Sequence, residues 1–572
     1  MNRAPSNCVA RALGLALLLP ALAVAQSPAA PGSAPDVPDW DLSERIEALD
    51  DLFSSWDRTD SPGCAVGVTH GGREVAFRAY GMADLEHPAR NTPSTVFEAG
   101  SVSKQFVAAA LILLHLDGEL SLEDDVRQYV PELPDYGQTI TIRHLLTHTS
   151  GLRDWGSVAS ISGWDRGSRT HDHDHVLEIL SRQTALNFPV GARYSYSNSG
   201  FNLGAVIVDR IQEESFHEFT RERIFRPLGM TSTQWRDDYR RVVPNRSSAY
   251  SGSEGAEDYR INRPIEHVHG NGGLLTTVGD LLKWTQALAS DHFGEAFTRE
   301  LLRQGVLTSG RTITYASGIQ VAERLDRPVV EHTGSTAGYR AYLGRYPDRE
   351  LAVAMLCNVT AVPTGGTGEG IAEIFLDGSA LEDAESNGSA ARPPPSVEVP
   401  SDDLRTMAGI YTDEHNHGPT EIVYENGGLE TAGGIPLTAV SGKEFRVGDS
   451  DTHYAFLPEE GTDRHRVRIV REGYEEEHLV PANPARELSE ADLREFEGTY
   501  TSVEADTEIV VRVRDGALVA QRSPASEWEL EPAYEDAFRG FGLLRFHRDS
   551  QGRITEFSYS AGRVYDLRFH RH

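Results

Sequence analysis

A serine and a lysine stand three residues apart where an apolar helix is predicted to begin. Ser101 and Lys104 come directly before the Ala- and Leu-rich run from Phe106 to Leu116. Residues at this spacing lie on one face of a helix, one turn apart. A serine hydroxyl becomes a good nucleophile when a neighbouring base removes its proton, and a lysine can be that base if its pKa is lowered by several units. The pair therefore predicts Ser101 as a nucleophile and Lys104 as its base.

The chain uses lysine so rarely that this one is informative. Of its 54 Lys and Arg residues, only Lys104, Lys283 and Lys443 are lysines. Arginine keeps its proton in proteins, whereas lysine can lose it. A solvated lysine at a helix start is the alternative, but the use of arginine almost everywhere else favours a chemical role for Lys104.

A tyrosine and an asparagine stand on a loop farther along the chain. Tyr196-Ser197-Asn198 precedes a helix predicted from Gly200 to Ile211. The phenol of Tyr196 could relay a proton between the serine and a leaving group, especially if a nearby lysine lowers its pKa. Asn198 could hold Lys104 or a substrate amide. Taken alone, the tripeptide is also typical of an ordinary loop.

A third motif, His332-Thr333-Gly334-Ser335, is predicted to begin a strand. Gly334 has no side chain and lets a substrate approach the backbone closely. The amides of Ser335 and Ser101 could donate to the oxyanion that forms when a carbonyl is attacked, and losing one such donor typically costs about a hundredfold or more in rate. A turn at a strand edge is the structural alternative.

Strand pairs on either side of a helical stretch are expected to position these motifs. Strand-like runs at 64–68 and 75–77 predict one hairpin, and runs at 339–346 and 351–357 predict another. Because helical patterns fill the chain between them, we expect one sheet assembled from distant segments. This catalytic domain is predicted to span 39–377.

The pattern changes after a polar, proline-rich linker at 378–400. The strand-like runs that follow repeat, since Tyr411 matches Tyr500 and Asn426-Gly427 matches Asp515-Gly516 at the same offset of 89. Asn-Gly and Asp-Gly favour tight hairpins. We predict two tandem all-β modules, 401–485 and 488–572, as small antiparallel barrels or half-barrels.

The beginning of the chain predicts export. Residues 1–25 have the pattern of a signal peptide, with an apolar run from Ala12 to Leu22 and small residues at 23–25, and 26–38 read as a leader linker. We therefore expect a periplasmic or extracellular protein. Cys64 and Cys357 lie in strand-like runs, and either a disulfide or two free thiols fits this pattern.

The overall charge limits the partners. A formal net charge of -32 repels phosphate backbones and anionic lipids, so we expect neither nucleic-acid binding nor stable membrane insertion after signal cleavage. A small-molecule or peptide substrate is expected instead, and association of copies of the chain stays open.

In this order, the three motifs resemble the serine β-lactamase and penicillin-binding protein family, and its class C branch in particular. The stretches LSLEDD at 120–125, LLTHTSGL at 145–152 and GGLLTT at 272–277 are similar to the same branch. The resemblance runs from about the first helix to Cys357. It implies an α/β catalytic domain of the β-lactamase/transpeptidase type, with an antiparallel sheet flanked by helices and a helical lobe, followed by the two all-β barrel-like modules.

The resemblance also implies a role for each motif residue. Ser101 is the expected acylated nucleophile, and Lys104 and Tyr196 are the expected proton-handling pair. The expected substrate contacts are Asn198, His332, Thr333, Gly334 and Ser335, the last through its amide in the oxyanion site.

One residue departs from the family pattern, because His332 stands where β-lactamases have a lysine. A histidine is mostly neutral near pH 7, whereas the lysine supplies a permanent charge that helps hold a substrate carboxylate. A histidine at this place and two C-terminal barrels are similar to D-aminopeptidases and related esterases. We therefore expect amide or ester substrates, including peptides or amides of D-amino acids. β-Lactamase or D-Ala-D-Ala carboxypeptidase activity, or a non-catalytic binding protein, are the alternatives.

No cofactor and no metal are expected. His171 and His175 of the run HDHDH could share one helical face and suggest a metal site. The run lies in a polar insertion, however, and a solvated helix start explains it equally well.

Overall fold

The computed structural model describes residues 41–572 apart from 257, 377–396, 449, 451, 460, 463, 472–475 and 523–525. The predicted signal (1–25), the leader (26–38) and most of the linker (378–400) lie outside the described residues. Within the described part, no helix is both long enough and apolar enough to cross a bilayer.

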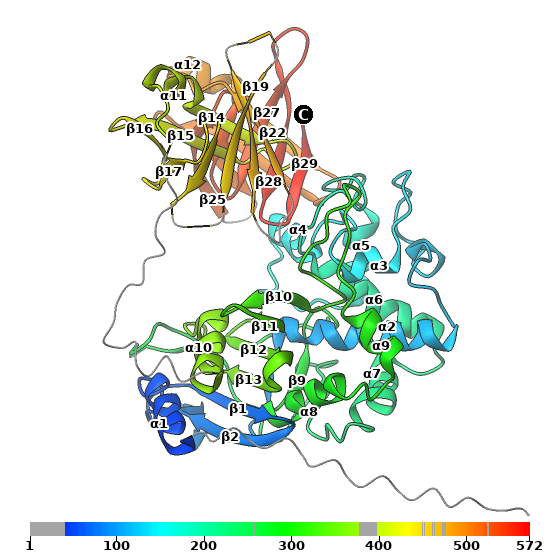
Figure 1. The fold of residues 1–572 in the computed structure, drawn as a ribbon. Helices are drawn as coiled ribbons and strands as arrows, with labels where there is room; N and C mark the ends of the chain where they lie inside the picture. Colours follow the sequence, from blue (N-terminus) through cyan, green and yellow to red (C-terminus); the bar gives the residue numbers. More distant parts are fainter. Residues whose placement is uncertain are drawn as a thin grey trace, which may run out of the picture. The chain divides into compact units, whose positions relative to one another are not determined.

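The catalytic domain is built on a six-stranded antiparallel sheet (Figure 1). Its strands, in order across the sheet, are β10 (Gln320–Arg324), β11 (Arg327–Thr336), β12 (Tyr339–Tyr346), β13 (Leu351–Cys357), β1 (Cys64–His70) and β2 (Arg73–Tyr80). Both predicted hairpins are confirmed, since β1 pairs with β2 and β12 pairs with β13. The prediction of one sheet from distant segments is also confirmed, because β1 pairs with β13.

Helices cover both faces of the sheet. The residues of β1 and β13 are all buried, as expected for strands with apolar layers on each side. On one face, α1 (Leu42–Leu52) and α10 (Thr364–Leu376) pack against Val66, Val68 and Val353. On the other, α8 (Val278–Ala289) packs against Ala65 and joins the larger core.

A disulfide joins the two central strands. Cys64 and Cys357 lie directly opposite each other in the β1–β13 register, and their sulfur atoms are bonded. Of the two alternatives left open by the sequence, the structure has the disulfide.

The helical lobe surrounds a buried central helix, α2 (Lys104–Asp117), which ends at Gly118 in a left-handed conformation. Every residue of α2 from Lys104 to Leu114 is buried, so this helix carries apolar side chains on all sides. The other helices of this domain are α3 (Ile142–Leu146), α4 (Trp155–Ile161), α5 (His173–Ser181), α6 (Asn198–Ile211), α7 (Phe216–Thr220) and α9 (Glu295–Leu301). Short strands complete it: β3 (Met82–Asp84), β4 (Ala89–Arg90), β5 (Phe97–Glu98), β6 (Gln234–Trp235), β7 (Tyr250–Ser251), β8 (Arg260–Ile261) and β9 (Leu274–Thr276).

Two closed eight-stranded barrels follow, each preceded by a short helix. The first comprises α11 (Ser401–Met407), β14 (Gly409–Asp413), β15 (Pro419–Glu425), β16 (Gly428–Thr431), β17 (Pro436–Ala439), β18 (Glu444–Val447), β19 (His453–Pro458), β20 (His465–Val470) and β21 (Glu477–Ala482). The second comprises α12 (Glu490–Leu493), β22 (Gly498–Ser502), β23 (Thr507–Arg514), β24 (Ala517–Arg522), β25 (Ser526–Tyr534), β26 (Ala537–Arg539), β27 (Leu543–Arg548), β28 (Ile554–Ala561) and β29 (Val564–Arg571). The prediction of two barrel-like modules is confirmed.

The repeated residues make the same contacts in each barrel. The Tyr411 hydroxyl donates to the Met407 carbonyl at 2.7 Å, and the Tyr500 hydroxyl donates to the Phe496 carbonyl at 2.8 Å. These bonds tie the first strand of each barrel to the segment before it. Both predicted hairpin dipeptides, at 426–427 and 515–516, have positive φ at each residue, which is the backbone of a type I′ turn.

The second barrel also packs against the helical lobe of the catalytic domain. Arg153 and Glu504 form a buried ion pair at 2.7 Å. The carbonyl of Arg563 accepts from the Asn187 side-chain amide at 3.0 Å, and the Tyr565 amide donates to Asn187 Oδ1 at 2.9 Å. The β28–β29 hairpin is therefore held against the lobe on both sides of Arg563.

Candidate active site

The nucleophile candidate lies on a tight turn between a short strand and the central helix. Ser101 belongs to a 3₁₀ turn, Gly100–Ser103, that leads directly into α2. A β-carbon on Gly334 would lie 2.1 Å from the Ala99 carbonyl oxygen, and one on Gly100 would lie 2.6 Å from the Ser335 amide nitrogen. These two glycines therefore allow β11 to approach the serine turn. The approach brings the backbone of Ser335 next to that of Ser101, as an oxyanion site requires.

Lys104 points from the first turn of α2 to three oxygen atoms. Its Nζ lies 3.2 Å from Ser101 Oγ, 3.0 Å from Asn198 Oδ1 and 2.7 Å from the carbonyl oxygen of Asn271. The side chain is buried. The geometry thus brings together the serine, the lysine and the asparagine that the sequence singled out.

The surroundings of Lys104 favour its neutral amine. Burial lowers its pKa well below the usual value, and the positive charges of Arg563 and Arg166 lower it further. A neutral amine has two N–H donors and one lone pair. Because the oxygens of Asn198 and Asn271 can only accept, they take the two donors. The lone pair then faces the Ser101 hydroxyl, which is the arrangement of a base ready to accept its proton.

Tyr196 completes the group, but its ionisation differs from the expectation. Its hydroxyl is hydrogen-bonded to Ser101, and Lys104 Nζ lies 4.8 Å from its ring centre. Burial raises the pKa of Tyr196, and this outweighs the hydrogen bond and the nearby positive charge of Arg563, which act in the opposite direction. The hypothesis of a lowered pKa is therefore wrong, and Tyr196 is a neutral phenol that can donate its proton and accept a hydrogen bond.

His332 is buried and neutral. The Tyr315 hydroxyl lies 2.8 Å from its Nε2, and the Thr333 carbonyl lies 2.5 Å from its Nδ1. Burial lowers the pKa of His332 to about 4, with a further contribution from Lys104. Its motif does not begin a strand, as the sequence predicted, but lies in the second half of β11.

A cavity of about 370 Å³ opens at Ser101. It is lined by Tyr196, Asn198, His332, Thr333 and Ser335 together with residues that sequence reasoning missed: Arg166, Asn271, Gln320 and Arg563. The cavity is therefore lined by all the predicted site residues except Lys104 and Gly334.

The sequence analysis did not predict Arg563 or His148 as site residues. Arg563 reaches the cavity from the β28–β29 hairpin, with its guanidinium 4.6 Å from the centre of the Tyr196 ring. The His148 ring lies behind the same tyrosine, at 4.2 Å between ring centres, and its Nδ1 accepts from the Ser197 amide. His148 lies in the predicted family stretch at 145–152, so its position could have been suspected, whereas nothing local marks Arg563.

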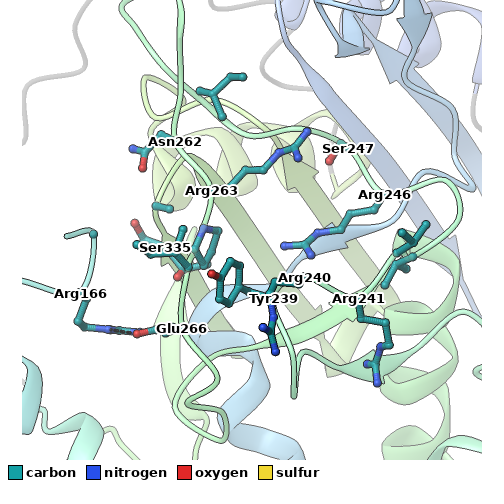
Figure 2. A pocket seen from close by; sticks show the side chains of 18 residues that line it. Arg166, Tyr239, Arg240, Arg241, Arg246, Ser247, Asn262, Arg263, Glu266 and Ser335 are labelled. Carbon is teal, nitrogen blue, oxygen red and sulfur yellow. Dashed lines mark hydrogen bonds and ion pairs between the residues drawn. The ribbon is translucent and has the colours of Figure 1, made fainter. Parts of the chain in front are cut away.

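A larger, arginine-rich cavity of about 1060 Å³ adjoins the first and shares Arg166, Ser335 and Thr336 with it. Figure 2 shows Arg246 and Arg263 on its walls and Arg166 beside Glu266. Arg166 is paired with Glu266 at 2.8 Å, which holds the guanidinium between the two cavities. A substrate longer than a single amino acid could therefore extend beyond Ser335.

Comparison with known proteins identifies the family. The model of the family described as Beta-lactamase matches residues 44–373. The chain belongs to this family. A penicillin-binding protein of Bacillus subtilis is 30% identical to it over 307 residues, covering 51% of this chain and 67% of that protein. A D-aminopeptidase of Cereibacter sphaeroides is 25% identical over 490 residues, covering 84% of this chain and 86% of the relative.

Solved structures share the fold. The D-amino acid amidase of Ochrobactrum anthropi SV3 matches with a TM-score of 0.50 and 21% identity, covering 61% of this chain and 100% of that chain. The octameric penicillin-binding protein homologue of Pyrococcus abyssi matches with a TM-score of 0.50 and 19% identity, covering 77% of this chain and 100% of that chain. With the family established, the chain is a serine hydrolase related to β-lactamases.

Proposed function

We propose that the chain hydrolyses amide or ester bonds through an acyl-enzyme on Ser101. The observation that carries this proposal is the position of Lys104 Nζ, 3.2 Å from Ser101 Oγ, with its other two contacts made to oxygens that can only accept. This arrangement leaves the lysine lone pair for the serine proton.

Acylation follows from the geometry. As Ser101 Oγ attacks the substrate carbonyl carbon, its proton passes to Lys104 Nζ and the carbonyl electrons move onto oxygen, where the amides of Ser101 and Ser335 stabilise them. When the tetrahedral intermediate collapses, the leaving group takes the Tyr196 proton, and Tyr196 recovers one from the Lys104 ammonium. A water then attacks the acyl carbon, its proton returns through the same pair, and Ser101 leaves protonated.

The preferred substrates are peptides, amides or esters of D-amino acids. The D-aminopeptidase relative, which this chain matches along most of both lengths, supports this class. The adjoining cavity at Ser335 supports substrates of peptide size.

A second candidate, cleavage of a substrate with a carboxylate beside the scissile bond, is favoured by one observation. Arg166 and Arg563 line the cavity at Ser101, and its described lining contains no Asp or Glu. A permanent charge that the neutral His332 cannot supply is thus present on other residues. β-Lactams and peptides ending in D-Ala-D-Ala carry such a carboxylate.

Export is also proposed. The signal-like segment at 1–25 supports it, and so does the Cys64–Cys357 disulfide, because disulfides persist mainly in oxidising compartments. Expression in a bacterial host followed by fractionation tests this: we expect a mature chain shortened by the signal in the periplasm or medium, and a full-length cytoplasmic product would contradict it.

Labelling with a fluorophosphonate and with a fluorescent penicillin, followed by intact-mass measurement, tests the acyl-enzyme. We expect one adduct on the wild type, none on Ser101→Ala, and the wild-type result for the exposed Ser290→Ala. An unlabelled wild type, or equal labelling of Ser101→Ala, would favour a non-catalytic binding protein.

A substrate panel separates the two candidates. D-Alanine p-nitroanilide and short p-nitrophenyl esters carry no carboxylate, whereas nitrocefin and a peptide ending in D-Ala-D-Ala do. The first candidate predicts a higher kcat/KM for the first pair, and the second candidate predicts a higher kcat/KM for the other.

A further inference from the structure

Three histidines and an aspartate that take no part in the proposed hydrolysis meet near the segment carrying Asn271. One ligand atom from each of His173, Asp209 and His269 lies within 4.8 Å of the others. His217 joins them, since its Nε2 lies 3.1 Å from Nε2 of His269. The four side chains come from α5, α6, α7 and the loop before β9, so the cluster joins four separate segments.

In two of the imidazoles, one nitrogen is already committed to an acceptor. His269 Nδ1 lies 3.1 Å from the His267 carbonyl, and His217 Nδ1 lies 3.3 Å from the Asp237 carboxylate. Because carbonyl and carboxylate oxygens only accept, each Nδ1 carries the proton, and the Nε2 of each ring is then a free lone pair. His173 Nε2 lies 3.1 Å from the His269 carbonyl and 3.4 Å from the His269 amide, so it contacts both an acceptor and a donor.

These two lone pairs face each other. With both Nε2 atoms unprotonated, the 3.1 Å contact between His217 and His269 has no hydrogen to share. A cation that accepts both lone pairs satisfies this geometry.

We propose that His173, His217, His269 and Asp209 form a binding site for a divalent cation of the zinc type. Neutral imidazole nitrogens suit zinc better than magnesium or calcium, and four ligands complete its tetrahedron. With zinc–nitrogen bonds of about 2.0–2.1 Å, ligand nitrogens lie roughly 3.3 Å apart, close to the His217–His269 separation. Asp209 is exposed, and its Oδ1 accepts from the Phe216 amide at 2.6 Å, which leaves the other carboxylate oxygen for the ion. The carbonyl and carboxylate partners of the second nitrogens are those typical of metal-bound histidines.

The sequence left the HDHDH run open between a metal site at His171 and His175 and a solvated helix start, and the solvated start holds neither for His171 nor for His173. His171 is buried and its Nε2 lies 2.9 Å from the Trp164 carbonyl. His175 takes part in the cap of α5 with Asp172. The histidine between them reaches the cluster, with partners about a hundred residues away in the chain.

The ion would hold the segment that supports the proposed base. The Asn202 side-chain amide donates to the His269 carbonyl at 2.7 Å and to Asn271 Oδ1 at 2.8 Å. The Asn271 carbonyl in turn contacts Lys104. Since four protein ligands leave no open position, the ion has a positioning role and does not touch the substrate.

The test uses the full chain after removal of metals with a chelator. Zn²⁺ titrated by calorimetry should bind one per chain and raise the Tm by several degrees, and Co²⁺ should give the visible absorption of a tetrahedral site. His217→Ala and Asp209→Asn should each weaken Zn²⁺ binding by at least tenfold. The exposed His87→Ala and the nucleophile variant Ser101→Ala should bind as the wild type does, which separates this site from the proposed hydrolysis.

Binding of less than one Zn²⁺ per wild-type chain would overturn the proposal. Equal affinity in the wild type and in Asp209→Asn would also overturn it. This variant serves if His217→Ala does not fold, because an asparagine oxygen can still accept from the Phe216 amide as Asp209 does. Tight Co²⁺ binding with the absorption of an octahedral complex would likewise contradict tetrahedral coordination by these four side chains.

Discussion

At the residue scale, Lys104 is unusual because an ionisable side chain has been buried among groups that disfavour its charge. Two arginines near it lower its pKa in the same direction as burial. These positive charges therefore keep the base neutral, and in the second candidate function they would also attract the substrate carboxylate. Activity should rise with pH as Lys104 loses its proton, at a pH well below 10.5.

Replacing this lysine tests its role as a base. Lys104→Arg keeps a cation but removes the lone pair, so we expect kcat/KM to fall by roughly 10³-fold or more. Kinetics on the best substrate of the panel would measure this. Lys283→Arg, a change of the same type at a half-exposed lysine, should keep wild-type activity. Comparable rates for Lys104→Arg and the wild type would contradict a lysine base.

The buried His332 should make stability depend on pH. Because the pKa of His332 is lowered to about 4 in the folded state, the unfolded chain binds the proton more readily. The contribution of His332 to the free energy of unfolding is therefore fully present above about pH 6.5. It falls by about 3 kcal/mol as the pH falls toward 4. Urea unfolding at pH 7 and 4.5 should show a smaller loss in His332→Gln than in the wild type, while the exposed His87→Gln should lose as much as the wild type. Equal losses in all three proteins would contradict the assignment.

At the scale of elements, the contact between β11 and the serine turn depends on the absence of a side chain. Gly334→Ala would put a methyl group 2.1 Å from the Ala99 carbonyl oxygen, so β11 must move away from Ser101. We expect loss of most fluorophosphonate labelling and a lower Tm. The matched control is Gly365→Ala in α10, where a β-carbon meets nothing within 4 Å. Labelling of Gly334→Ala at the wild-type rate would show that the oxyanion site does not need this contact.

The elements also show what the sequence could and could not predict. Hairpins followed from local alternation and from Asn426-Gly427 and Asp515-Gly516, because turn conformation is a property of adjacent residues. The Ser101–Lys104 spacing is local in the same sense. The third partner of Lys104 is the backbone carbonyl of Asn271. Every residue has a backbone carbonyl, so the sequence does not mark this one as a partner. The raised pKa of Tyr196 depends on burial by distant segments, which no local pattern reports.

At the scale of the whole molecule, the second barrel contributes to the cavity. Arg563 lies on a hairpin fixed by Asn187, and the Arg153–Glu504 ion pair is buried beside it. Arg563 is distant from Ser101 in the chain, and only the packing of two domains brings them together. This is why the sequence analysis could predict the barrel but not which of its residues reaches the site.

Arg563→Ala tests this contribution. If the second candidate function holds, kcat/KM for a carboxylate substrate should fall by at least tenfold, mainly through KM, because a charge-assisted contact is lost. A neutral ester should be affected much less. Arg553→Ala changes an exposed arginine of the same barrel and should leave both rates unchanged. An equal fall for both substrates would assign Arg563 to the proton transfer rather than to substrate binding.

The bond between Cys64 and Cys357 closes a covalent ring that contains the serine turn, the helical lobe and β11. A protease that cuts an exposed loop inside this ring would not release either fragment while the bond remains oxidised. Nicked protein should migrate as one species that carries the Ser101 adduct on a non-reducing gel, and it should separate into two fragments after reduction.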